Sequence, residues 1–177
     1  MVIARTERLT LRPMAMTDLD DMASLLGDPE VMRYYPAPKS REEAARWITW
    51  NLDNYERHGF GLWVVETLDG TFVGDCGLTV QEVEGRAEVE IGYHVRIEAQ
   101  GRGLATEAAM ACRDRAAALG VQRLIAIVDP DNIPSQRVAA KLGMHQEKTS
   151  SAHGGQRLIY ATRLDGPTQD LEQLSNT

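Results

Sequence analysis

Apolar residues recur at helical spacing in four segments of the chain. In the first segment, Leu19, Met22 and Leu26 lie on one face, and a capping-box pattern at residues 17–20 precedes them. The second segment opens at another capping box, Ser40–Glu43, and glycine follows each of the four segments as a stop signal. The predicted helices cover residues 19–26, 40–59, 104–119 and 135–142.

Elsewhere the pattern changes to strand-like alternation or to short apolar runs. Leu9 and Leu11 alternate with polar residues, which predicts a half-buried strand over residues 5–12. The turn signals Asp69–Gly70 and Glu84–Gly85 divide the next apolar stretch into a meander of three antiparallel strands. The seven predicted strands cover residues 5–12, 62–67, 72–83, 88–95, 124–128, 144–151 and 157–164.

The chain has 177 residues, of which 43% are hydrophobic, enough for one well-buried core. We therefore expect a single domain over residues 1–164. Residues 165–177 are polar and lack periodicity, and they are predicted to form a disordered tail. Because no stretch approaches the roughly 18 apolar residues of a membrane span, and the first residues lack an apolar signal-peptide core, we expect a cytoplasmic protein without a membrane partner.

The formal net charge of −7 argues against a nucleic-acid partner, whose binding would depend on a basic surface. Cys76 and Cys112 form neither a CxxC pair nor a disulfide framework, so we expect both to be small buried apolar residues. The four histidines show no ligand spacing with each other or with the cysteines. No metal is therefore expected.

The most informative motif is the hexapeptide Gln100–Ala105, which joins a predicted strand to a predicted helix. The first amides of a helix have no intrahelical partner and lie at the positive end of its dipole, so they attract anions. Gly101 and Gly103 remove side chains where a ligand would approach, Arg102 adds positive charge, and Thr106 adds a hydroxyl. A pyrophosphate would fit there. The alternative is a tight strand-to-helix turn without a ligand.

The order of these elements around the glycine turn resembles the Gcn5-related N-acetyltransferase (GNAT) fold over about residues 5–164. Five segments, namely residues 6–12, 28–31, 90–93, 132–135 and 141–144, are similar to the branch that acetylates the N-terminal amines of ribosomal proteins, the RimJ/RimL type. That branch also contains enzymes for other amines. The resemblance implies an α+β fold with α/β/α layers. It implies a mostly antiparallel mixed sheet of about seven strands, a splayed parallel pair, and about four helices.

The resemblance also implies acetyl-CoA as the acetyl donor. Its pyrophosphate would lie on the amides that the helix-terminus argument selects, and its pantetheine arm would lie along the strand at residues 88–95. Asn132 resembles the asparagine that bonds this arm, although an Asx-turn residue is the alternative. The implied cofactor-binding residues are Val95, Gly101, Arg102, Gly103, Leu104, Ala105, Thr106 and Asn132.

Acetyl transfer requires a proton acceptor for the amine, a donor for the oxyanion, and a proton for the departing thiolate. Glu90 is the candidate base; the alternative is an ordinary solvent-facing glutamate, since Glu88 shares its strand face. A backbone amide beside Gly92 or Tyr93 is the candidate oxyanion donor, because this strand commonly carries a bulge in the family.

Ser135 matches a small hydroxyl residue that lies close to the sulfur in related branches, and it is the candidate acid. A helix N-cap is its alternative role, and the two roles are compatible. The chain departs from the commonest family arrangement because residues 138–141 contain no tyrosine. If an acid is needed, Ser135 or solvent must therefore serve.

These features predict an N-acetyltransferase in which a primary amine, either a protein N-terminus or a small molecule, attacks acetyl-CoA directly through a tetrahedral intermediate. The alternative function is a non-catalytic acyl-CoA sensor or interaction module. Acceptor recognition is expected from residues 31–39, the helix with Trp47 and Trp50, and the final hairpin around His153, although core packing is the alternative for the two tryptophans. A monomer or a homodimer is compatible with the sequence.

Overall fold

A computed structural model describes residues 1–151 and 154–165. Within these residues eight strands form one sheet in the order β1-β2-β3-β4-β5-β6-β8-β7. The pair β5 and β6 is parallel, and every other neighbouring pair is antiparallel. The strands are β1 (Ala4–Arg5), β2 (Leu9–Arg12), β3 (Leu62–Thr67), β4 (Phe72–Val83), β5 (Arg86–Val95), β6 (Arg123–Val128), β7 (His145–Ser150) and β8 (Arg157–Arg163).

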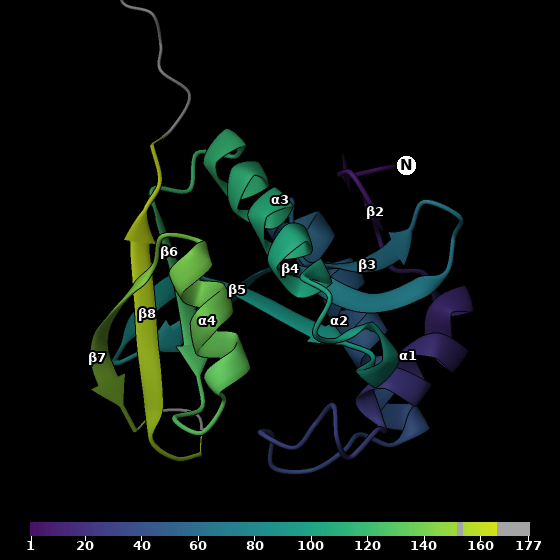
Figure 1. Ribbon diagram of the computed structural model, residues 1–177, viewed down its shortest axis with the longest axis horizontal. Coiled ribbons are helices and arrows are strands. Elements are labelled where there is room, and N and C mark those ends of the chain that lie inside the picture. Colours follow the sequence, from purple (N-terminus) through teal and green to yellow (C-terminus); the bar gives the residue numbers. More distant parts are fainter. Residues whose placement is uncertain (152–153, 166–177) are drawn as a thin grey trace, which may run out of the picture.

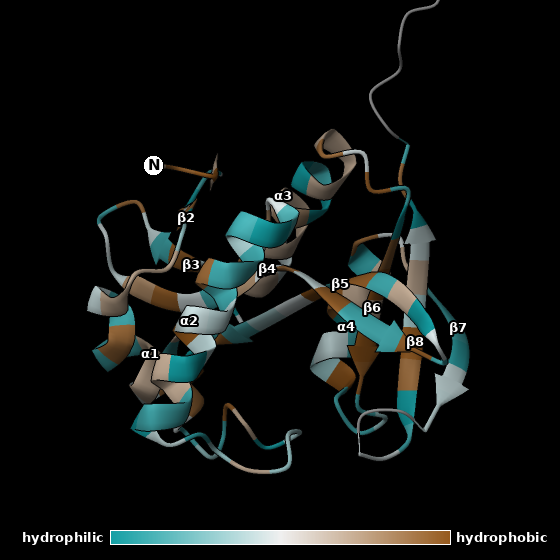
Figure 2. Ribbon diagram, turned by 180° about the vertical axis from the view of Figure 1, so that it is seen from behind, coloured by the Kyte–Doolittle hydropathy of each residue, from teal (hydrophilic) through white to brown (hydrophobic). Residues whose placement is uncertain are grey.

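Helices cover both faces of this sheet. Figure 1 shows α3 and α4 in front of it, and Figure 2, from behind, shows α1 and α2 over the opposite face. The described part of the chain contains α1 (Leu19–Leu26), α2 (Arg41–His58), α3 (Leu104–Ala118) and α4 (Ile133–Lys141), with short 3-10 helices η1 (Met16–Asp18) and η2 (Ile97–Ala99). The expected α/β/α arrangement with a mixed, mostly antiparallel sheet is confirmed.

The ends of α2 follow the sequence signals closely. Ser40 Oγ accepts a hydrogen bond from the Glu43 amide at 3.2 Å, and Glu43 Oε2 accepts one from the Ser40 amide at 2.7 Å. These two bonds complete a capping box. Gly59 ends the helix in the left-handed conformation, with φ of 76°.

The beginning of α1 differs from the prediction. A capping box at residues 17–20 does not form; instead Asp18 Oδ2 accepts a hydrogen bond from the Ala15 amide at 2.8 Å, and Met16–Asp18 is a 3-10 turn. The Asp18 carboxylate also forms an ion pair with Arg12 at 2.8 Å. This contact ties the start of the helix to β2, and local spacing cannot reveal it.

The expected single strand over residues 5–12 is also wrong, because it is two strands joined by a tight turn. Ala4 pairs with Leu11, and the Thr6 amide donates to the Leu9 carbonyl at 2.9 Å. The turn is held from outside, because Thr6 Oγ1 donates to Glu107 on α3 at 2.6 Å. The split produces eight strands in the described residues, where the sequence predicted seven.

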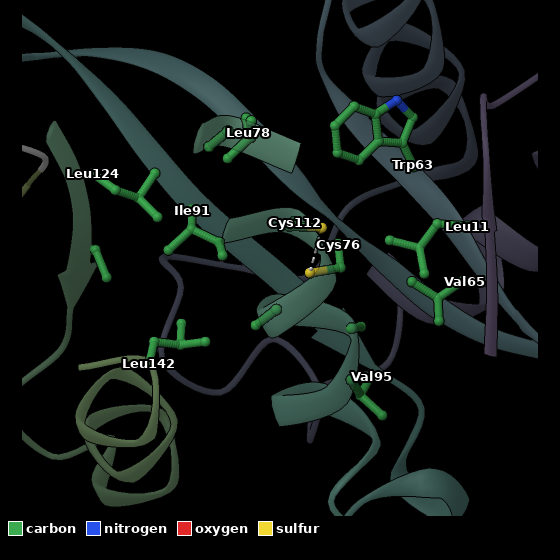
Figure 3. Packing of buried hydrophobic residues seen from close by; sticks show 14 of the residues in the cluster. Leu11, Trp63, Val65, Cys76, Leu78, Ile91, Val95, Cys112, Leu124 and Leu142 are labelled. Carbon is green, nitrogen blue, oxygen red and sulfur yellow. Dashed lines mark hydrogen bonds between the residues drawn. The ribbon is translucent and has the colours of Figure 1, made fainter. Parts of the chain in front are cut away.

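Two main groups of buried apolar residues fill the layers on either side of the sheet. The larger group packs α3 and α4 against one face and includes Trp63, Cys76, Leu78 and Cys112, as Figure 3 shows. The sulfur atoms of the two cysteines are 3.5 Å apart and both residues are buried as free thiols, so the prediction for them is confirmed. The second group packs α1 and α2 on the other face.

The sheet opens at one place. The parallel strands β5 and β6 pair at Val89 with Leu124 and at Glu90 with Ile125, and the described residues show no further pair between them. On its other side β5 is paired with β4 without interruption, from Arg86 with Val83 to Val95 with Gly74. The last residues of β5 therefore present a free strand edge beside a splayed gap, as the resemblance implied.

Some expectations lie outside the described residues. These are the disordered tail beyond Asp165 and the tip of the final hairpin at His153, since residues 152–153 and 166–177 are not described. Within the described ranges, no helix has the length and apolar content needed to cross a membrane. The same ranges contain no group of three or more His, Cys, Asp or Glu side chains arranged to hold a metal ion.

Candidate active site

The glycine loop forms an open backbone cradle at the start of α3. Gly101 and Gly103 both have left-handed φ angles, 72° and 77°, and no atom lies within 4 Å of the position that a Gly101 Cβ would take. The Glu107 amide bonds to the Gly103 carbonyl at 3.0 Å as the first turn of α3 closes. The preceding amides of residues 104–106 lie before this bond, and such amides at the positive end of a helix can bind an anion.

Arg8 supports this loop from the side. Its Nη1 donates to the Arg102 carbonyl at 3.0 Å, and its Nε donates to Glu107 Oε2 at 2.7 Å. Desolvation opposes ionisation of Glu107, but hydrogen bonds from Thr6 and Arg8 outweigh it and keep its pKa below the ordinary value. The turn between β1 and β2 thus fixes the loop conformation. This role of Arg8 was not predicted from the sequence, although the residue lies in a segment that carried the family resemblance.

Glu90 lies where β5 and β6 separate. Side chains alternate along β5, so Glu90, Gly92 and His94 face the α1 and α2 layer. Glu90 Oε2 accepts a hydrogen bond from Thr79 Oγ1 at 3.2 Å. Desolvation raises the pKa of Glu90 to about 7, which leaves the carboxyl group close to half ionised at neutral pH.

Glu88 shares that strand face but has a different environment. Its carboxylate accepts a hydrogen bond from Arg123 Nε at 3.1 Å, and the same guanidinium bonds Glu147 on β7 at 2.8 Å. Glu88 therefore belongs to an ion-pair network across the second half of the sheet. Glu90 instead lies where β5 and β6 separate, and desolvation raises its pKa.

Ser135 approaches the gap from the opposite side of the sheet. Asn132 is the N-cap of α4, with its Oδ1 accepting from the Ser135 amide at 3.1 Å, so the alternative role of Ser135 as the N-cap is wrong. The Ser135 hydroxyl instead lies 2.8 Å from the hydroxyl of Tyr93 on β5. The side chain of Tyr93 was not among the predicted site residues, because only the fold brings it to Ser135.

The main chain of β5 bears on two expectations, the bulge near Gly92 or Tyr93 and the pairing of the pantetheine arm near Val95. The unbroken pairing with β4 shows that β5 carries no bulge on that side near Gly92 or Tyr93. The pantetheine arm was expected to pair with the main chain near Val95, and the Val95 carbonyl already accepts a hydrogen bond from Gln100 Nε2 at 3.0 Å. A ligand on this edge would therefore share that carbonyl, which has two lone pairs.

A buried polar cluster lies beside Glu90 on the α1 and α2 face. Asp75 is fully buried; its Oδ1 is 2.7 Å from His94 Nδ1, and its Oδ2 accepts from Trp47 Nε1 at 3.1 Å. The Tyr35 ring packs over His94 at a centroid distance of 5.0 Å. Desolvation at the hydroxyl, followed by the charges of Glu90 and Asp75, raises the pKa of Tyr35. Tyr35 from residues 31–39 and Trp47 from α2 thus pack against His94, on the same strand face as Glu90.

Comparisons with known proteins agree with the family resemblance found in the sequence. A family model described as the acetyltransferase (GNAT) domain matches residues 8–145. The chain is 39% identical over 149 residues to the uncharacterized protein YkkB of Bacillus subtilis (strain 168), covering 81% of this chain and 86% of that protein. It is 34% identical over 149 residues to the uncharacterized N-acetyltransferase p20 of Bacillus licheniformis, covering 80% and 82%.

Among solved structures, RimL, a ribosomal L7/L12 alpha-N-protein acetyltransferase in complex with coenzyme A, superimposes with a TM-score of 0.77 at 19% identity, covering 93% of this chain and 99% of RimL. This likeness shows that the two proteins share a fold. The sequence matches establish the class: the chain belongs to the GNAT family of acetyltransferases.

Proposed function

We propose that this protein is an N-acetyltransferase that moves the acetyl group of acetyl-CoA to a primary amine. The observation that carries the proposal is the gap between β5 and β6, which has the open glycine cradle at one end and the Glu90 carboxylate at its apex. Family membership supports acetyl transfer in general. The geometry supports the assignment of roles to this chain's own residues.

The donor would bind on the α3 and α4 side of the sheet. The amides from Arg102 to Thr106, with Gly101 and Gly103 providing clearance, would hold the pyrophosphate in the cradle. The free edge of β5 up to Val95 would pair with the pantetheine arm as an added strand does. The Oδ1 atom of Asn132 caps α4, and its side-chain NH₂ is the group that would bond this arm.

The acceptor would approach from the α1 and α2 side. Glu90 takes a proton from the amine, because desolvation raises its pKa to about 7 and so brings its proton affinity close to neutral pH. Ser135, on the other face, provides a proton for the departing sulfur. Base and acid thus lie on opposite faces of one splayed strand pair, and the acetyl group passes between them.

The acceptor class is a primary amine, either a protein N-terminus or a small molecule. The shared fold with RimL makes peptide N-termini the first candidates, consistent with the five segments that resemble the RimJ/RimL branch. The aromatic residues Tyr35 and Trp47, which pack against His94 on the same strand face as Glu90, would contact the acceptor. The protein would act in the cytoplasm as a monomer or a homodimer.

Two measurements on the same protein test this function. Isothermal titration with acetyl-CoA measures donor binding, and a free-thiol release assay against N-terminal peptides, polyamines and aminoglycosides measures transfer. Gly103→Glu, which puts bulk and negative charge at the start of α3, should weaken acetyl-CoA binding by more than tenfold. Gly120→Glu is the matched control, because Gly120 follows the other end of α3 with a similar φ of 82° and lies in open surroundings, away from the Arg8 guanidinium that is 3.5 Å from the Cβ position of Gly103.

Binding with thiol release on one amine class would support the transferase and identify its acceptor. Binding without release on any amine would favour the acyl-CoA sensor instead. Equal affinities of the two glycine variants for acetyl-CoA would remove the assignment of the phosphate site to residues 101–106.

A further inference from the structure

Two hydroxyl groups from different elements meet on the donor side of the gap. Tyr93 Oη on β5 and Ser135 Oγ on α4 are 2.8 Å apart, a strong hydrogen-bond distance between hydroxyls. Tyr93 is three residues beyond Glu90, so the strand pleat directs it to the opposite face of the sheet. A carboxylate and a hydroxyl pair therefore flank the same splayed gap from its two sides.

Local structure does not require this contact. Asn132 supplies the cap of α4, so the Ser135 hydroxyl is not needed to satisfy the helix end. The Tyr93 ring packs against the larger apolar group, and it would do so equally well as a phenylalanine. The hydroxyl pair is thus an addition to the packing, formed between β5 and α4.

Tyr93 is protonated at neutral pH. Desolvation raises its pKa to about 12, with the hydrogen bond to Ser135 acting in the opposite direction and Cys76 adding to the increase. The phenol therefore keeps its proton at neutral pH and can donate it to Ser135 Oγ. When Ser135 Oγ accepts this hydrogen bond, its own proton can be donated to a group other than Tyr93.

We propose that Tyr93 and Ser135 form a two-hydroxyl proton relay to the departing thiolate. This inference rests on the proposed function. When the tetrahedral intermediate collapses, the carbon–sulfur bond breaks and its electron pair goes to sulfur. The Ser135 proton passes to sulfur and the Tyr93 proton passes to Ser135 Oγ, so the serine is restored. The phenolate regains a proton from water, and the proton that the amine loses leaves through Glu90, so protons and charge balance.

The experiment compares Tyr93→Phe, Ser135→Ala and the double variant. Single-turnover thiol release isolates the chemical step, and titration with acetyl-CoA monitors donor binding. Each single variant should lower the single-turnover rate constant by about 100-fold, the lower range for general acid catalysis, and the double variant should lose no more. Ser135→Thr, which retains a hydroxyl, should recover most of the rate.

Tyr160→Phe is the matched control, because Tyr160 on β8 packs against the same apolar group. It should keep the wild-type rate, and all variants should keep the wild-type affinity for acetyl-CoA. Two outcomes with an active wild type would overturn the relay alone. In the first, the single-turnover rate constant of Tyr93→Phe stays within twofold of the wild-type value. In the second, the losses in rate of the two single variants multiply in the double variant. A wild type that releases no thiol with any amine would overturn the proposed function and the relay with it.

Discussion

Glu90→Gln should make the protein more stable at alkaline pH, and the size of this effect follows from the position of Glu90. Desolvation raises the pKa of its carboxyl group from the ordinary 4.5 to about 7 in the folded chain. The folded state therefore binds a proton more tightly than the unfolded state does. This contribution to stability is complete below pH 4.5 and is lost as the pH rises through 7.

The magnitude can be worked from these two pKa values. Each pKa difference of one corresponds to about 1.4 kcal/mol, so ionised Glu90 destabilises the fold by about 3 kcal/mol at pH well above 7. Between pH 5 and pH 8 the contribution of Glu90 to the free energy of unfolding falls by about 2.5 kcal/mol. The change is smaller than the full effect of about 3 kcal/mol because part of the ionisation of the unfolded chain occurs below pH 5. Glutamine has nearly the same shape as protonated glutamate and does not ionise.

Urea unfolding at pH 5 and pH 8 measures the effect. The free energy of unfolding of Glu90→Gln, minus that of the wild type, should increase by about 2.5 kcal/mol between the two pH values. Glu82→Gln is the control, because Glu82 is an exposed glutamate on the neighbouring strand β4, and its difference from the wild type should not change with pH. A pH-independent difference for Glu90→Gln would refute the desolvation argument, and with it the reason for assigning Glu90 as the base.

Three further predictions concern other parts of the molecule. Arg8→Lys should weaken acetyl-CoA binding about fivefold in titration calorimetry, because the glycine loop loses a hydrogen bond worth about 1 kcal/mol; unchanged affinity would contradict the supporting role. Cys76 and Cys112 should not react with a thiol reagent in the folded protein, since burial raises the pKa of Cys76, and both should react in urea; rapid reaction without urea would contradict their burial. Asp75→Ala should lower the free energy of unfolding by about 3 kcal/mol in urea, because it removes the acceptor for the His94 amide, His94 Nδ1 and Trp47 Nε1; a loss below about 1 kcal/mol would show that water replaces the carboxylate.

The features that were predicted correctly from the sequence are those with local causes. The turn at Glu84 and Gly85, with φ of 51° and 78°, and the capping box at Ser40 depend on residues that are close in the chain. The glycine turn before α3 belongs to the same group, because a helix start and two glycines indicate it locally, whereas the support that Arg8 gives the loop was not predicted. The expectation that this loop binds acetyl-CoA came from the family resemblance and not from the local pattern.

The features that were missed depend on contacts between distant segments. The strand predicted over residues 5–12 divides because Thr6 and Arg8 bond Glu107, about 100 positions later in the chain. The Tyr93 hydroxyl meets Ser135 because β5 and α4 border the same gap, with 42 positions between them. Alternation along β5 indicates which face Tyr93 occupies, but no local pattern shows what lies opposite.

The two residue pairs that join β5 to β6 have a mechanical consequence. The sheet consists of two halves, β1 to β5 and β6 to β8, held together by a seam that is only two pairs long in the described residues. A ligand that occupies the gap would contact both β5 and β6 and so connect the two halves of the sheet. Donor binding would then stiffen the whole sheet, so the width of the gap and the rigidity of the molecule would be set together.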